Sequence, residues 1–568
     1  MIEAALLRLV DDVGVLAEEP VVRAFAMLKA TDMVNYLRLR HAAKVANRAC
    51  SVTTLDKLVR GELPHADTEP SVLDDLVDLG RSQCQLHHDA DRQAVAIIPT
   101  PACQEVWRVM STGYESWLRA AYWRTNESGV TDMTLRAALA TLSAAGVNDG
   151  DQVEVHLRAA QAEPGYLIDL CDEHWRAVHV TARGWHVLNT SPRLFTRTQS
   201  QRPLPQPQAG ADIGLLWQHV NIPADRRLMV LTWLLECFRP DTPFPGLELV
   251  GEQGSAKSTT QSILRSLIDP NKVMLRGRPK TVEDIFVAAQ NNWLVSYENL
   301  SGLTAEQQDA FCTLATGGGF ASRLLYTNGE EHVMETKRPV VLNGIAVVAT
   351  RPDLIDRVIH VSMPVIAATA RKDDADTQAA WERDHPRVFG ALLDVFSAAL
   401  RILPTVQLTH KQRMADFERL GEAVARAVGF EAGHFQQQYA EQVRTGVDRA
   451  LESNCVAQVL DRYIQERILP FAWQGTAGQL YELLNGQLMS DRASWPKSPK
   501  GLADQLRRIA PAYRAKGIEI THLGHSREGA IWRIATTSTT PEFRTFDATP
   551  PSVSPVSVGG TRYGAHRE

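Results

Sequence analysis

The sequence predicts a multidomain α/β protein in which a central mixed domain lies between mostly helical regions. Its 568 residues exceed the roughly 150 residues of an average domain several times over. A hydrophobic content of 44% allows sizeable cores to be buried. Strand-like and helix-like patterns alternate through residues 241–364, around a glycine-rich loop. Helical periodicity dominates before and after this segment, which completes the predicted fold class.

Changes of pattern along the chain predict six segments. They are a helical N-terminal region (1–103), a mixed α/β leader (104–240), an α/β core (241–365), a helical region (366–454), a small mixed unit (455–536) and a disordered tail (537–568). Short β-rich runs in the leader, YLIDL, AVHVTA and GWHVLN, are expected to be strands. The tail is assigned to disorder because Ser, Thr, Pro and Gly dominate it and large apolar residues are few.

Charge, cysteine content and hydropathy exclude several classes of protein. The net charge of −6 is not that of a bulk polycation, so any nucleic-acid surface must be a local patch. Seven dispersed cysteines without a CxxC pair favour a reducing cytoplasm. The acidic N-terminus lacks the basic start of a signal peptide, and the apolar stretch 228–238 is shorter than the about 20 residues that span a bilayer. We therefore expect a cytoplasmic protein without a membrane partner.

The glycine-rich loop after the apolar run 247–250 carries the clearest functional motif. The pattern GxxxxGK[ST] is matched, with alanine in place of its second glycine, by the run Gly251, Glu252, Gln253, Gly254, Ser255, Ala256, Lys257, Ser258, followed by Thr259. Glycines let backbone N–H groups turn toward phosphate oxygens, and the following helix presents its positive end to them. Lys257 would reach the β- and γ-phosphates and Ser258 would bind Mg²⁺. The sequence therefore predicts binding of ATP and Mg²⁺.

Three polar residues at the ends of later apolar runs would complete an ATP-hydrolysing site. Glu298 follows the run 293–297, about 40 residues after the loop, and would help to hold Mg²⁺. Many ATPases have a second acid at the next position, where this chain has Asn299; an amide orients water but cannot accept its proton. Asn343 ends a third apolar run and would sense the γ-phosphate from a strand beside the acidic one.

Arg357 precedes another predicted strand and is the candidate arginine finger. In ring ATPases such an arginine enters the neighbouring subunit's site and stabilises charge in the transition state. The other interpretation is a surface ion pair with Asp353 or Asp356, and Arg351 is the rival finger.

In this order, the motifs resemble the AAA+ ATPase of superfamily 3 helicases. The pieces ENLSGL, LATGGGFASRLLYTNGEE, RPVVLNGI and RPDLIDR carry the resemblance, which extends to phage and plasmid primase-helicases and to actinobacterial mobile-element ATP-binding proteins. It implies a P-loop AAA+-like core with a helical leader and a helical lid. In the small C-terminal unit, residues 476–485 and 498–511 are predicted to be helices, the second of them ending at Pro511, and the hairpin predicted after them suggests a winged helix. The resemblance also implies a homo-oligomeric ring, commonly a hexamer, that acts on single-stranded or forked DNA beside a separate primase or replication partner.

Two segments could contact DNA. The family's channel hairpin corresponds to RLLYTNGEEHVMETK, where Asn-Gly favours a tight turn. Arg323, His332 and Lys337 are its positive candidates; two glutamates near the tip leave an oligomer contact as the other interpretation. In the C-terminal unit, residues 495–535 hold eight Lys or Arg against three acids. Its phosphate-contact candidates are Lys500, Arg507, Arg508 and Arg527. A protein-binding winged helix is the alternative there.

The function predicted from these motifs is that of an ATP-hydrolysing DNA translocase or helicase in the replication system of a mobile genetic element. Asn299 and Ala256 depart from the usual pattern and motivate a second hypothesis, a nucleotide-dependent oligomeric switch or scaffold in phage defence or replication control. A small-molecule P-loop kinase is a third interpretation, against which the sensor and finger positions speak.

Overall fold

The computed structural model describes residues 2–47, 50–62, 71–323, 331–452, 454–467, 471–486, 495–527 and 529–536. The tail expected to be disordered lies outside these residues. The chain forms two compact units, one of Met1–Ala96 with Arg108–Gln152 and one of Ile97–Trp107 with Val153–Glu568. The main division therefore falls after residue 152, whereas the sequence suggested boundaries after 103 and 240.

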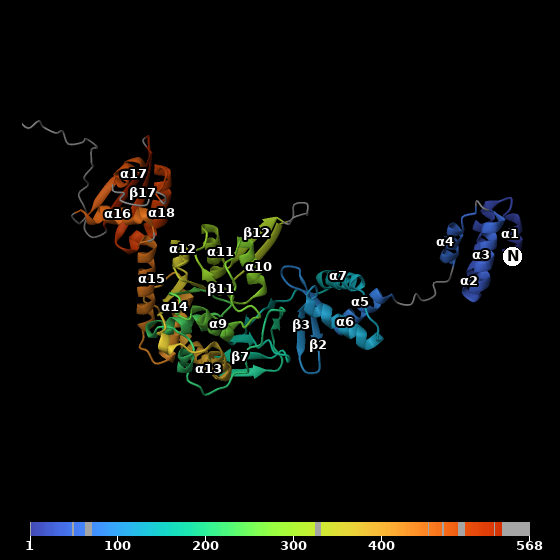
Figure 1. Ribbon diagram of the computed structural model, residues 1–568, viewed down its shortest axis with the longest axis horizontal. Helices are drawn as coiled ribbons and strands as arrows, with labels where there is room; N and C mark the ends of the chain where they lie inside the picture. Colours follow the sequence, from blue (N-terminus) through green and yellow to red (C-terminus); the bar gives the residue numbers. More distant parts are fainter. Residues whose placement is uncertain are drawn as a thin grey trace, which may run out of the picture. The chain divides into compact units, whose positions relative to one another are not determined.

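The N-terminal part contains two groups of helices and a small sheet. Helices α1 (Ile2–Arg8), α2 (Glu19–Thr31), α3 (Met33–Ala46) and α4 (Val52–Glu62) lie together (Figure 1). They enclose a core of their own that contains Phe25. Helices α5 (Val72–Gln83), α6 (Thr112–Asn126) and α7 (Asp132–Asn148) follow, and strands β1 (Gln85–His88), β2 (Ala94–Pro99) and β3 (Gln104–Arg108) form a sheet in that order. The N-terminal region is mostly helical, as expected, but strands β1 and β2 within it were not predicted, because a short apolar run such as AVAIIP has no periodicity that separates strand from helix.

The segment from 153 to 240 begins as a small antiparallel sheet. Strands β5 (Ala159–Gln161), β6 (Tyr166–Asp169), β7 (Ala177–Thr181) and β8 (Gly184–Leu188) lie in sequence order, and β4 (Val155–His156) pairs with β9 (Leu194–Phe195). Strands β6, β7 and β8 confirm the three strands predicted here. After two short 3₁₀ turns, η2 (Ile213–Gln218) and η3 (Ala224–Arg226), helix α8 (Arg227–Glu236) is buried on every side, as its uninterrupted apolar sequence requires.

The central domain is built on a four-stranded parallel sheet. Strands β10 (Gly246–Val250), β11 (Val295–Leu300), β14 (Val340–Gly344) and β15 (Val358–Ser362) lie in the order β11-β14-β10-β15. Helices α9 (Lys257–Ile268), α10 (Val282–Asn291), α11 (Ala305–Thr316) and α12 (Pro352–Ile355) connect them. Val250 pairs with Gly344, so the carboxyl ends of the two central strands meet at one edge, where α/β sheets bind ligands.

A hairpin branches from this domain between α11 and β14. Strands β12 (Gly318–Arg323) and β13 (Glu331–Thr336) are antiparallel, with Arg323 opposite Glu331. The pairing confirms the predicted hairpin, and the expected Asn-Gly turn lies outside the described residues.

One hydrophobic core unites the leader with the central domain and the following helices. It contains Tyr166, Trp233, Leu247, Leu264 and Phe396, all less than a tenth exposed. The leader from 153 onward is therefore part of the central fold. The core also includes residues of α13 (Asp374–Ile402), α14 (Ala415–Ala427) and α15 (His434–Glu452). These helices confirm the helical region predicted after residue 366.

Within this helical region, the stretch Asp374–Thr405 is long and apolar enough to cross a membrane by length and composition alone. Half of its most apolar window is buried in the protein, where Val388, Phe389 and Phe396 are fully enclosed. The apolar face of this stretch is therefore the core-facing side of a long helix.

The C-terminal unit has a separate core around Trp532 and Tyr513. Its order is α16 (Cys455–Gln465), β16 (Ala472–Thr476), α17 (Ala477–Asn485), α18 (Pro499–Ala515), β17 (Ile518–Ser526) and β18 (Gly529–Thr536), with a sheet in the order β16-β18-β17 (Figure 1). Both predicted helices and the hairpin are present. The expected helix end at Pro511 was wrong, since α18 continues through it to Ala515.

Candidate nucleotide site

The phosphate loop connects the carboxyl end of β10 with the first residue of α9. The Lys257 ammonium lies inside the loop, where it donates hydrogen bonds to the carbonyls of Gly251 at 2.7 Å and Glu252 at 2.8 Å. Burial lowers the pKa of Lys257. The loop closes on itself through Ser255, whose hydroxyl donates to the Glu252 carbonyl at 2.8 Å. The predicted strand, loop and helix are all found, with the lysine at their centre.

The backbone of the loop shows why its sequence pattern asks for glycines. Gly254 has a φ of +82°, and Ala256, the residue that departs from the motif, has a φ of +52° and a ψ of +36°. Both lie in the left-handed region, which costs an L-residue with a side chain about 1–2 kcal/mol. Ala256 keeps the fold of the loop and carries this strain directly before Lys257.

Glu298 lies on β11 and contacts the first turn of α9, directly after the phosphate loop. The Ser258 hydroxyl donates to its carboxylate at 3.0 Å, which brings together the two predicted Mg²⁺ ligands. The pairing of β11 with β14 shifts between Tyr297 and Leu300, so Glu298 and Asn299 form a bulge at the strand end. Asn299 takes a φ of +52°, a conformation that asparagine tolerates better than most residues. Its side chain is exposed.

Asn343 holds this bulge in place. It is fully buried on β14, its Oδ1 accepts the Asn299 N–H at 2.8 Å and its Nδ2 donates to Gln261 at 2.5 Å. Gln261 in turn donates to Ser296 Oγ at 2.8 Å and to the Tyr297 carbonyl at 3.0 Å. The expected placement of Asn343 beside the acidic strand is found, and its amide is engaged with protein groups on both sides.

Gln261 was not predicted as a site residue, although its position relative to Lys257 is a signal. Gln261 follows Lys257 by four residues and therefore shares its side of α9, yet it is buried without any exposure. Fully buried one turn after Lys257, Gln261 links α9 to the strands that end in Glu298 and Asn343.

Arg357 lies at the opposite end of the sheet from the phosphate loop of its own chain. The Arg357 carbonyl accepts the N–H of Gly246, the first residue of β10. Gly251 lies five residue steps further along the strand, or roughly 16 Å from Gly246. Arg357 Nη1 donates to the Asp353 carbonyl at 2.6 Å. At this distance Arg357 cannot act on the phosphate loop of its own chain. An arginine finger that acts on a neighbouring subunit is expected to lie in such a position.

The acids considered as partners of Arg357 are paired with another arginine. Arg413 Nη1 lies 3.6 Å from Asp353 and 3.8 Å from Asp356, and Arg351, the rival finger, forms an ion pair with Asp309 at 3.1 Å. Burial raises the pKa of Asp356. The proposed surface pair of Arg357 is thus replaced by a bond to a backbone carbonyl.

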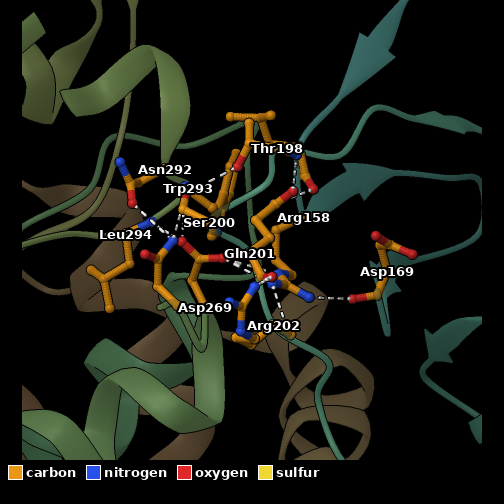
Figure 2. A network of polar contacts seen from close by, with 12 residues as sticks. Arg158, Asp169, Thr198, Ser200, Gln201, Arg202, Asp269, Asn292, Trp293 and Leu294 are labelled. Atoms are coloured by element: carbon orange, nitrogen blue, oxygen red, sulfur yellow. Dashed lines mark hydrogen bonds and ion pairs between the residues drawn. The ribbon is translucent and has the colours of Figure 1, made fainter. Parts of the chain in front are cut away.

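A buried polar network connects the leader to the nucleotide site (Figure 2). Arg158 and Asp269 are both fully buried, and Asp269 Oδ1 accepts from Arg158 Nε at 3.1 Å and Nη2 at 3.0 Å. The other oxygen accepts the N–H groups of Trp293 at 3.0 Å and Leu294 at 3.2 Å. Asp269 caps the end of α9, and Trp293 leads into β11, so a leader arginine fixes the two elements that carry Lys257 and Glu298.

The predicted DNA contacts of the hairpin are only partly described. The backbones of Arg323 and His332 lie on β12 and β13, and their side chains are outside the described set. Lys337 follows the base of the hairpin, where its ammonium lies 5.6 Å from the ring centre of Phe244 and burial lowers its pKa. Lys337 is therefore engaged with an aromatic side chain of the central domain.

The four basic candidates of the C-terminal unit are exposed. Lys500 and Arg507 share a face of α18 with Asp504, and Arg507 forms an ion pair with that acid at 2.7 Å. Arg527 lines a cavity of about 370 Å³ between α17 and the β17–β18 hairpin. Lys500, Arg508 and Arg527 thus remain the freer positive candidates among the described residues of this unit.

Comparison with known proteins identifies two regions. A family described as actinomycete integrative conjugative element replication protein matches residues 213–441, and its C-terminal domain family matches residues 456–549. No curated protein matches the chain.

Two solved structures show weak likenesses. They are the A-form apo structure of the NrS-1 C-terminal region, with a TM-score of 0.35 and 12% identity over 81% of this chain and 100% of that chain, and JCV helicase, with a TM-score of 0.21 and 18% identity over 41% of this chain and 64% of that chain. The two family matches show that residues 213–441 and 456–549 are similar to the replication proteins of actinomycete integrative conjugative elements.

Proposed function

We propose that this chain hydrolyses ATP at the phosphate loop and uses the reaction to move along DNA as a helicase during replication of its element. The observation that carries the proposal is the contact between Ser258 and Glu298 at 3.0 Å beside the Lys257 ammonium. A hydroxyl and a carboxylate oxygen are the donors that Mg²⁺ prefers, so this pair fits the metal that accompanies ATP. The bound metal would neutralise phosphate charge.

Each residue of the site then has a defined task. Lys257 leaves the loop carbonyls for the β- and γ-phosphates, and the N–H groups at the start of α9 face the same anion. Glu298 holds its position through the bulge that Asn343 supports. Asn299, exposed on that bulge, orients the attacking water, and another acid or the substrate phosphate accepts its proton.

The position of Arg357 supports action between subunits of a ring of the superfamily 3 type. An Arg357→Ala protein and a Lys257→Ala protein should each be inactive alone. Mixed together, they should regain part of the ATP hydrolysis, because an intact loop can then meet an intact finger in some of the interfaces. Activity that stays absent in every mixture, although the two proteins co-assemble, would refute the assignment.

The C-terminal unit supports DNA binding. Its order of helix, strand, two helices and hairpin agrees with a winged helix, and its exposed cations are suited to phosphate contacts. Strand displacement on forked DNA tests the proposal. ATP should support displacement by the wild type and not by Lys257→Ala, whereas displacement of no substrate by a protein that hydrolyses ATP would contradict the helicase activity.

The second candidate is a nucleotide-dependent switch or scaffold in phage defence or replication control. The exposed amide of Asn299 at the place of a second acid, and the strained Ala256, favour slow turnover. ATP-dependent assembly with turnover far below one per second, indifferent to DNA, would favour this candidate. Brisk turnover stimulated by DNA would exclude it.

A further inference from the structure

A segment that follows β15 runs along the phosphate loop from its first residue to its middle. We call residues 363–371 the strap. The N–H of Met363 donates to the Val250 carbonyl at 2.7 Å, and the N–H of Ile366 donates to the Gly254 carbonyl at 3.0 Å. These two bonds fix the strap beside both glycines of the loop.

Asn221, from the leader, binds the strap and the loop together. Its Nδ2 donates to the Ser255 carbonyl at 2.9 Å and to the Pro364 carbonyl at 2.7 Å, and its backbone N–H donates to Thr260 Oγ1 at 3.1 Å. Through its side chain and its backbone N–H, this one residue thus connects the loop, the first turn of α9 and the strap. The strap is therefore held in a defined place relative to the phosphate-binding N–H groups.

The two loop glycines are in close contact with the strap. A Cβ added at Gly251 would lie 2.8 Å from the Met363 carbonyl oxygen, and one added at Gly254 would lie 2.6 Å from Arg371 Nη2. The Arg371 guanidinium consequently lies directly over the backbone of Gly254. The positive φ favours glycine at 254, and the guanidinium occupies the space that a Cβ would take.

From this arrangement we propose that Arg371 is a second phosphate-binding cation, which contacts the polyphosphate of the nucleotide held by its own chain. Its side chain is exposed, and no acidic partner for it is found in the part of the chain that the structure describes. The loop itself contributes one cation, Lys257, and one acid, Glu252. A second cation at the loop would offset that acid and pair with a phosphate oxygen in a charge-assisted hydrogen bond.

The proposal rests on the proposed nucleotide binding and extends it to a residue that the motif does not contain. Arg371 and Lys257 approach the loop from different segments, one from the strap and one from α9. Since the exposed Arg371 side chain has no hydrogen bond or ion pair within the described residues, its removal should alter nucleotide affinity and leave the fold intact.

The experiment measures binding of a fluorescent methylanthraniloyl ADP with Mg²⁺ to the full chain. Arg371→Ala should weaken binding about tenfold, and Arg371→Lys should retain part of the affinity because it keeps the charge. Lys372→Ala, which removes the adjacent exposed cation, is the matched control and should bind like the wild type. Thermal unfolding of all three variants should match the wild type.

Three outcomes would separately refute nucleotide binding, the role of Arg371 and the contact of Arg371 with phosphate. If neither the wild type nor any variant binds the probe, the proposed function fails. If the wild type binds, Lys257→Ala does not and Arg371→Ala equals the wild type, then the role of Arg371 alone is refuted. If Arg371→Ala weakens competition by adenosine as much as by ADP, the guanidinium contacts the nucleoside, and the assignment to phosphate is wrong.

Discussion

Replacing Asp269 by asparagine tests whether the leader is built into the same fold as the central domain. The carboxylate accepts four hydrogen bonds, two from Arg158 and one each from the N–H groups of Trp293 and Leu294, and both charged groups are fully buried. An asparagine of the same shape offers one oxygen. Either the Arg158 guanidinium or the two backbone N–H groups must then face an NH₂ group.

The cost follows from these contacts. Asp269→Asn leaves the Arg158 charge buried without a counter-charge and deprives two donors of an acceptor, for which we expect a loss of about 3–5 kcal/mol in the free energy of unfolding. Urea-induced unfolding followed by tryptophan fluorescence measures it. Adding Arg158→Met to Asp269→Asn should recover part of the loss, since no unpaired charge then remains.

The matched control is a carboxylate whose ion pair is exposed. Asp504 bonds Arg507 at 2.7 Å on the surface of α18, and Asp504→Asn should leave the unfolding midpoint unchanged. A loss below about 1 kcal/mol for Asp269→Asn, with an unchanged midpoint for the control, would refute the reasoning that this buried pair joins the leader to the central domain.

Three further predictions concern the loop, the acid and pH. Ala256→Gly should relieve left-handed strain and stabilise the protein by up to about 1 kcal/mol in urea unfolding, whereas Ala379→Gly, in the exposed interior of α13, should lose about 1 kcal/mol. Glu298→Gln should keep nucleotide binding and lower single-turnover hydrolysis by about a hundredfold; an unchanged rate would remove Glu298 from the mechanism. Burial lowers the pKa of His385 to about 4, so the unfolded chain, with a histidine near 6.5, binds an extra proton as the pH falls through this range. Stability should therefore fall by about 2 kcal/mol more in the wild type than in His385→Phe between pH 7 and pH 5, and equal losses would contradict the pKa assignment.

The local features of the nucleotide site could be predicted from the sequence because strand, loop and helix are contiguous. The apolar run before Gly251 and the helix that starts at Lys257 are found where they were expected. Glu298 and Asn343 each end an apolar run, and parallel strands bring such ends together at one sheet edge.

The partners of these residues could not be predicted, because tertiary packing selects them. Asn221 lies 34 residues before its partner Ser255, and Asp269 accepts a hydrogen bond from Arg158, 111 residues away in the sequence. No local sequence pattern indicates either contact. The same reason explains the error about the leader. Its strands were recognised, but their burial against α13 depends on residues about 200 positions away.

Steady-state ATP hydrolysis with and without single-stranded DNA, with Lys257→Ala as the control, tests whether the chain is a DNA-stimulated ATPase. We expect hydrolysis by the wild type that rises when DNA is added and disappears in Lys257→Ala. Slow hydrolysis whose rate does not change when DNA is added would contradict the proposed translocase activity and favour the nucleotide-dependent switch. Hydrolysis that persists in Lys257→Ala would contradict the assignment of the phosphate loop itself.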